Sequence, residues 1–236
     1  MELYDGIITH TGEFLSQRPF QRWDYDPSAA WEDAGQSELV LGRDTAYELG
    51  GSGTFAVHYT CVTGNSALVD RDEILLYGPD LGELRKDAHY ARLCFLNITD
   101  PGGDDETAYR AIREIEFVKY HVFPRGFMLR ISSTDQREQV RLSKEAIRKG
   151  ISFKAVGFDF IKKYRENPLV KQVRMIFITD TSIDYRTLER NAKTAADITG
   201  TLTHIMEGIA LNCSACTLKP ICDEVEGMRE LHLRRN

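Results

Sequence analysis

Apolar residues fall into short runs of strand length, which alternate with segments whose apolar positions recur every three or four residues. Strands that alternate with helices predict an α/β fold, in which a mixed sheet is covered by helices and the early strands can form an antiparallel section. The predicted strands are Thr54–Val62, Glu73–Tyr77, Tyr90–Ile98, Phe127–Ser132 and Val170–Thr179. The predicted helices are Asp105–Tyr120, Ser143–Lys149, Phe153–Glu166 and a last one that is capped by Ser182 or Asp184 and runs to about Thr199.

The two ends of the chain lack this pattern. Residues 1–38 mix aromatic residues, prolines and acids without a sustained period, which predicts an irregular N-terminal arm packed on the body. Residues 39–211 are then the α/β domain. Residues 212–236 hold three of the five cysteines and are predicted to be a metal-binding tail.

Composition and charge exclude several classes of protein. Hydrophobic residues make up 42% of the 236 and charged residues 28%, which is typical of a globular protein and not of disordered, collagen-like or coiled-coil chains. The net charge of -6 argues against a nucleic-acid partner, because phosphate binding requires clustered basic residues. No apolar run approaches the roughly 20 residues of a membrane span, and the N-terminus has no secretory signal pattern. A cytoplasmic location without a membrane partner is expected.

The cysteines near the C-terminus carry the most specific chemical signal. Cys213, Cys216 and Cys222 follow the spacing C-x2-C-x5-C, whereas Cys61 and Cys94 lie alone in strand-like sequence. Two thiolates two residues apart can bind one ion from a single turn of backbone, and Pro220 stiffens the return to the third. Buried free thiols are the alternative. In a cytosolic chain the grouping favours a metal over a disulfide framework.

The identity of the metal and the fourth ligand are both open. Three thiolates favour an iron–sulfur cluster, most simply 4Fe-4S, but zinc is equally suited to three cysteines and one histidine. His232 is the nearest candidate for the fourth ligand. One straight helix would separate it from Cys222 by about 15 Å, so the chain must bend, and Gly227 is the obvious place. Cys61, Cys94 or an external ligand are the other options, and an open iron could bind substrate.

Five short segments share their order along the chain with segments of one known family. They are Leu76–Leu81, Arg113–Tyr120, Arg141–Ala146, Phe153–Gly157 and Val173–Asp180. In this order they resemble the middle region of the β subunit of carbon monoxide dehydrogenase/acetyl-CoA synthase, with similarity from about Leu39 to His232. The resemblance implies an α/β region followed by a 4Fe-4S cluster on Cys213, Cys216 and Cys222.

Departures from the family pattern bear on activity. The family's cluster motif has a longer gap between its second and third cysteines, and a fourth cysteine where this chain has His232. Its nickel site uses a Cys-x-Cys pair on a further domain, and no such pair occurs up to Asn236. Acetyl-CoA synthesis by this polypeptide alone is therefore not expected.

A group of basic residues is the second candidate site. Arg141 and Lys144 lie on or beside a short predicted helix, and the resemblance suggests that they could hold an anion such as the phosphates of coenzyme A. The alternative is a solvated face, with Glu145 and Lys149 paired at i and i+4.

Three functional hypotheses follow. In the leading one the chain is an iron–sulfur subunit or accessory of a larger anaerobic enzyme, working in electron transfer, docking or substrate handling. In the second it is an enzyme with its own open cluster or anion-binding centre. In the third it is a zinc-stapled interaction domain.

Overall fold

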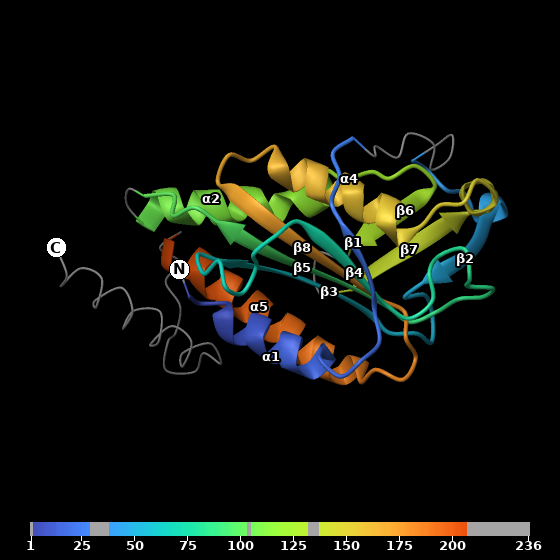
Figure 1. Cartoon of the computed structure of the whole chain (residues 1–236), viewed down its shortest axis with the longest axis horizontal. Helices are drawn as coiled ribbons and strands as arrows, with labels where there is room; N and C mark the ends of the chain where they lie inside the picture. The colour runs from blue at the N-terminus through green and yellow to red at the C-terminus, as the bar shows by residue number, and fades with distance from the viewer. Residues whose placement is uncertain (1, 29–37, 103–104, 132–136, 207–236) are drawn as a thin grey trace.

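Two sheets organise the protein (Figure 1). The computed structural model describes residues 2–28, 38–102, 105–131 and 137–206. The first sheet has the strand order β1-β4-β8-β5-β3, and the second has the order β2-β7-β6. The strands are β1 Gln21–Asp24, β2 Thr45–Leu49, β3 Ala56–Thr63, β4 Glu73–Tyr77, β5 Tyr90–Ile98, β6 Phe127–Ile131, β7 Glu138–Ser143 and β8 Val170–Ile178. The helices are α1 Asp5–Leu15, α2 Asp105–Phe117, α3 Lys144–Arg148, α4 Phe153–Arg165 and α5 Tyr185–Met206, with 3-10 turns η1 Gly42–Asp44 and η2 Val118–Tyr120.

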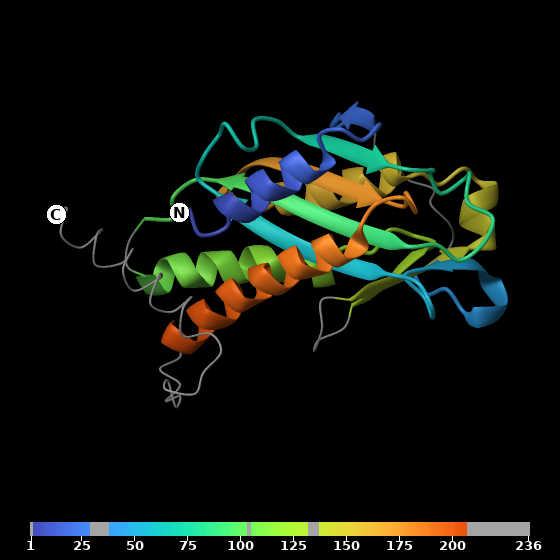
Figure 2. The ribbon, with the colours of Figure 1, turned by 90° about the horizontal axis from the view of Figure 1, so that it is seen from below.

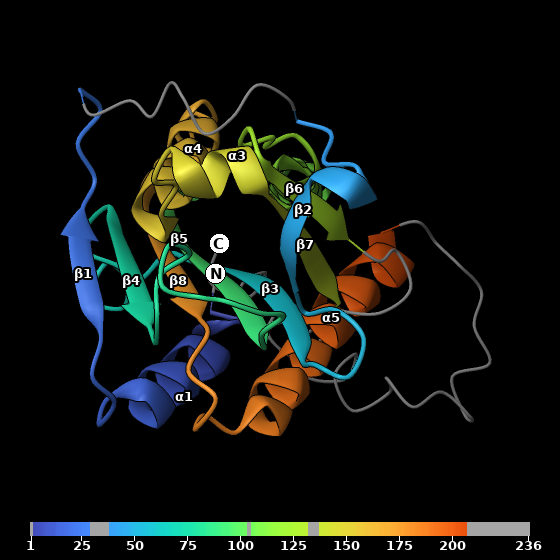
Figure 3. The same ribbon diagram turned by 90° about the vertical axis from the view of Figure 1, so that its right-hand side faces the viewer.

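The five-stranded sheet is mixed, as the sequence predicts. β3 is parallel to β5 and β4 is parallel to β8, whereas β5 and β8 are antiparallel. Helices α1 and α5 lie on one face, and α4 and the second sheet lie on the other (Figure 3). Every residue of β3, β4 and β5 is buried, which explains why these strands appear in the sequence as nearly continuous apolar runs.

The second sheet is joined to the first by a buried ion pair. Arg92 of β5 donates to both carboxylate oxygens of Glu138 in β7, at 2.7 and 2.5 Å, and neither side chain is exposed to solvent. The guanidinium also lies over the ring of Phe160 in α4, 4.5 Å from its centroid. One residue of β5 thus fixes both α4 and the second sheet on this face.

The N-terminal segment differs from the prediction of an irregular arm. Residues 5–15 form α1, which buries Ile7, Ile8 and Leu15 against the core. The Thr11 hydroxyl lies 2.9 Å from the Tyr59 hydroxyl of β3. The prediction of irregular structure is wrong for this helix, because two glycines and two threonines obscured a helical apolar period that tertiary packing stabilises. Downstream, β1 forms an edge strand antiparallel to β4.

Strands β2 and β7 were also not predicted. In β7 the buried positions alternate with partly exposed ones, and the first buried position is Glu138. An inward carboxylate breaks the apolar alternation by which a half-buried strand is identified, and here its partner is 46 residues away in the chain. The other predicted strands and helices are confirmed, with their ends shifted by a few residues and α5 extended to Met206.

Candidate functional site

The predicted metal ligands lie outside the described residues. Cys213, Cys216, Cys222 and His232 all fall within residues 207–236, so their assignment stays a prediction. In the described ranges, no three His, Cys, Asp or Glu side chains come together as a potential metal site.

The two remaining cysteines are buried free thiols. Cys61 in β3 and Cys94 in β5 are completely covered, and burial raises the pKa of both thiols above the ordinary value. Cys94 is in register with Thr60, so the two cysteines are one position apart across the ladder and face opposite sides of the sheet. Their environment is that of core residues.

Arg141 and Lys144 are engaged in contacts within the fold. The Arg141 Nε donates to Glu48 of β2 at 2.6 Å, and the Lys144 ammonium donates to the backbone carbonyl of Arg43 at 3.0 Å. The predicted pairing of Glu145 with Lys149 at i and i+4 is confirmed, with their charged atoms 3.4 Å apart. Anion binding at Arg141 and Lys144 stays a prediction.

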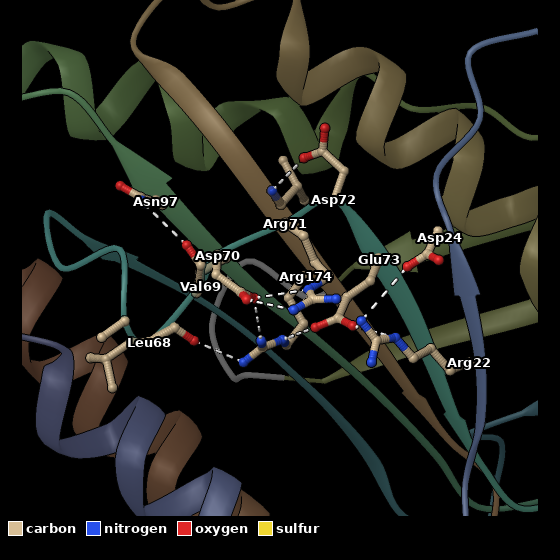
Figure 4. Close-up of polar contacts among 12 residues, drawn as sticks. Arg22, Asp24, Leu68, Val69, Asp70, Arg71, Asp72, Glu73, Asn97 and Arg174 are labelled. Carbon is tan, nitrogen blue, oxygen red and sulfur yellow. Dashed lines mark hydrogen bonds and ion pairs between the residues drawn. The ribbon is translucent and has the colours of Figure 1, made fainter.

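A charged network joins β1, β4 and β8 (Figure 4). The Glu73 carboxylate, which is nearly fully buried, is held at 2.5 Å by Arg174 and at 2.9 Å by Arg22. Arg174 also donates to the backbone carbonyl of Leu68 at 2.8 Å and lies 3.5 Å from Asp70. Each Glu73 oxygen has a guanidinium partner, so the network fixes the start of β4 and the preceding segment. We interpret the role of this network as stabilisation of the fold.

A cavity of about 280 Å³ lies at the free edge of the five-stranded sheet. Helices α2 and α5 lie side by side there, beside β3 (Figure 2). The lining residues are Tyr59, Thr60, Arg113, Glu116, Lys119, Tyr120, Ala195, Ala196, Thr199, Gly200 and Thr203. Tyr59 and Thr60 are neighbours whose side chains face opposite sides of the sheet, so the cavity opens onto the outer edge of β3.

Hydroxyl groups connect the walls of the cavity. The Thr199 hydroxyl of α5 donates to Glu116 of α2 at 3.1 Å and lies 2.9 Å from the Tyr4 hydroxyl. One turn further along α5, the Tyr109 hydroxyl donates to Thr203 at 3.2 Å. These contacts fix the Glu116 carboxylate at the α5 wall.

Arg113 and Lys119 supply positive charge to the same cavity. Arg113 lies over the ring of Phe117, 5.3 Å from the centroid, and Lys119 lies 5.2 Å from the ring centroid of Tyr120. Within the described ranges, neither cation has a carboxylate within ion-pair distance. Burial lowers the pKa of Lys119, and the nearby guanidiniums of Arg92 and Arg113 act in the same direction, while Glu116 opposes them.

His58 of β3 has no hydrogen-bond partner in the described part of the chain. Its side chain is 1% exposed, and neither ring nitrogen forms a hydrogen bond with a described residue. Burial holds its pKa well below the ordinary value, with Lys119 and Arg92 contributing in the same direction. His58 is therefore a neutral imidazole at physiological pH and adds no charge to the region.

Sequence reasoning did not identify this cavity. Its residues come from β3, α2, η2 and α5, which are far apart in the chain. One signal was available, because Arg113, Glu116 and Lys119 recur every three residues and so share one side of a helical segment. Which element covers that side becomes known only from the fold.

Comparison with known families assigns the chain to one of them. The model of the CO dehydrogenase/acetyl-CoA synthase complex beta subunit family matches residues 29–183, which is well over half of the chain. No curated protein matches the chain significantly. In the described part of the chain, no helix is both long enough and apolar enough to cross a membrane. The matched range includes strands β2 to β8 and helices α2 to α4, and the resemblance over the middle region is thereby confirmed. The chain belongs to the CO dehydrogenase/acetyl-CoA synthase complex β subunit family.

Proposed function

We propose that this chain is an iron–sulfur protein that works as a small subunit or accessory of a larger anaerobic enzyme. The observation that carries the proposal is the C-x2-C-x5-C spacing of Cys213, Cys216 and Cys222 in a member of this family. The matched range ends at Ile183, so the assignment of the cysteines rests on their own spacing. A cluster held there would supply one-electron transfer.

The fold limits where such a centre can lie. The last described residue of α5 is Met206, seven residues before Cys213. Seven residues of fully extended chain span at most about 24 Å. In this proposal the first cysteine lies within that distance of the end of α5, the helix that packs beside α2.

The predicted ligands are compatible with two kinds of inorganic centre. Three thiolates with an imidazole from His232 suit a 4Fe-4S cluster or a single zinc ion. Of these, the cluster agrees better with a family whose complex carries out redox chemistry. Zinc bound by the same ligands would correspond to the third hypothesis, an interaction domain whose metal stabilises the C-terminal tail and transfers no electrons.

Replacing Cys216 with Ser tests the site. Cys216 is the central thiolate of the motif, so Cys216→Ser should remove most of the bound metal from anaerobically purified protein, measured by elemental analysis. The matched control is Cys61→Ala, which deletes a buried core thiol and should keep the wild-type metal content. Equal metal content in wild type and Cys216→Ser would refute the assignment.

A further inference from the structure

The cavity between α2 and α5 contains positive charge that the described residues do not neutralise. Arg113 and Lys119 both line it, and neither has an ion-pair partner within that part of the chain. Each lies over an aromatic ring, which supports the cation but does not compensate its charge. Two cations that face one partly enclosed space, without a carboxylate partner among the described residues, favour an anion between them.

The charge balance favours a monoanion. Arg113 and Lys119 face the cavity as cations and Glu116 as a carboxylate, which leaves one net positive charge. On the sheet side, Arg92 is neutralised by Glu138, and burial keeps His58 neutral. A phosphate dianion would exceed this charge and would face the fixed Glu116 carboxylate.

The walls provide a place for a short apolar group beside the charges. Ala195, Ala196 and the ring of Tyr120 line the same space of about 280 Å³. A second cavity of about 300 Å³ shares Arg113, Glu116, Lys119 and Tyr120 with it and extends it past Phe117. This volume suits a ligand of a few heavy atoms with one charged end and one apolar end.

We propose that this cavity binds a short-chain monocarboxylate, whose carboxylate lies between Arg113 and Lys119 and whose chain packs on Ala195 and Ala196. The lining of the cavity includes no residue of the cysteine motif, so the binding test and the metal analysis give independent results. A bound carboxylate supplies the counter-charge that Lys119 lacks, and the pKa of this lysine should rise when the ligand binds.

Calorimetry with propionate and butyrate on the full chain tests the proposal, with inorganic phosphate as the competing anion. Both carboxylates should bind, butyrate more tightly, and phosphate should bind at least tenfold more weakly. Lys119→Met should weaken butyrate binding at least tenfold. The control is Lys163→Met, which removes a solvent-exposed lysine of α4 that pairs with Glu166, and its affinity should equal that of the wild type.

A second readout follows the lysine itself and does not depend on a variant that folds. Reductive methylation of Lys119, measured by peptide mass spectrometry, should slow in the presence of butyrate, whereas methylation of Lys163 should not change. Equal binding by wild type and Lys119→Met, tighter binding of phosphate than of butyrate, or no protection of Lys119 would each overturn the proposal.

Discussion

Replacing Glu138 with Gln should lower the free energy of unfolding by about 3–5 kcal/mol, because it leaves the Arg92 guanidinium buried without its counter-charge. The two side chains are completely inaccessible to solvent and form two hydrogen bonds of 2.7 and 2.5 Å. The Tyr90 hydroxyl also donates to Glu138, at 3.2 Å. Among the described residues, one terminal guanidinium nitrogen of Arg92 has no hydrogen-bond partner even in the intact pair, so these residues offer no further acceptor to replace the lost carboxylate.

Urea denaturation of the full chain measures this loss. Glu145→Gln is the matched control, because Glu145 is partly exposed and lies 3.4 Å from Lys149 on α3. Its loss should not exceed about 0.5 kcal/mol. A double replacement, Arg92→Met with Glu138→Leu, should recover much of the stability lost in Glu138→Gln, since it removes both charges. A similar midpoint for Glu138→Gln and Glu145→Gln would show that the pair does not join the sheets.

Gly78→Ala should destabilise the protein by about 2–5 kcal/mol, through backbone strain and a steric clash together. Gly78 has φ +106°, a value that L residues rarely adopt. A Cβ there would approach the Thr179 hydroxyl to 2.8 Å and the Asp180 Cα to 2.9 Å, and would also meet the Asp180 backbone nitrogen. The same turn joins the ends of β4 and β8, because the Tyr77 carbonyl accepts from the Thr179 and Asp180 amides at 2.9 and 3.1 Å.

Comparison with Gly53→Ala separates the effect of backbone strain from that of the steric clash. Gly53 also has positive φ, +76°, but a Cβ there would meet no atom within 4 Å. Its loss should be about 1 kcal/mol, and the difference between the two variants in thermal or urea unfolding reports the clash at Gly78. If both alanine variants unfolded at the same point, the close approach between the Gly78 turn and Asp180 would be disproved.

The sequence predicts the elements whose burial is uniform and misses those whose stability comes from distant partners. β4 and β5 are buried throughout and consist mostly of apolar residues, and they were predicted with their observed ends. α1 has weak helical propensity and is stabilised by contacts with β3 and α5, 48 or more residues away. β7 begins with an inward carboxylate whose partner is Arg92. A local sequence pattern does not show stabilising contacts with residues that are far away in the chain.

The same distinction applies to the candidate sites. A local spacing is enough to propose the cysteine motif, because its ligands are within ten residues of one another. The carboxylate cavity is assembled from four elements, and its essential property is that Arg113 and Lys119 lack partners in the described structure. That property depends on the packing of α2 against α5, which no local pattern specifies.

Metal analysis of the full chain, purified without exposure to oxygen and combined with its absorption spectrum, tests the central claim most directly. A cluster on Cys213, Cys216 and Cys222 predicts bound iron with sulfide, and a brown protein whose visible absorbance bleaches on reduction. A colourless protein with one equivalent of zinc would contradict the redox role, and a protein without any metal would contradict the site itself.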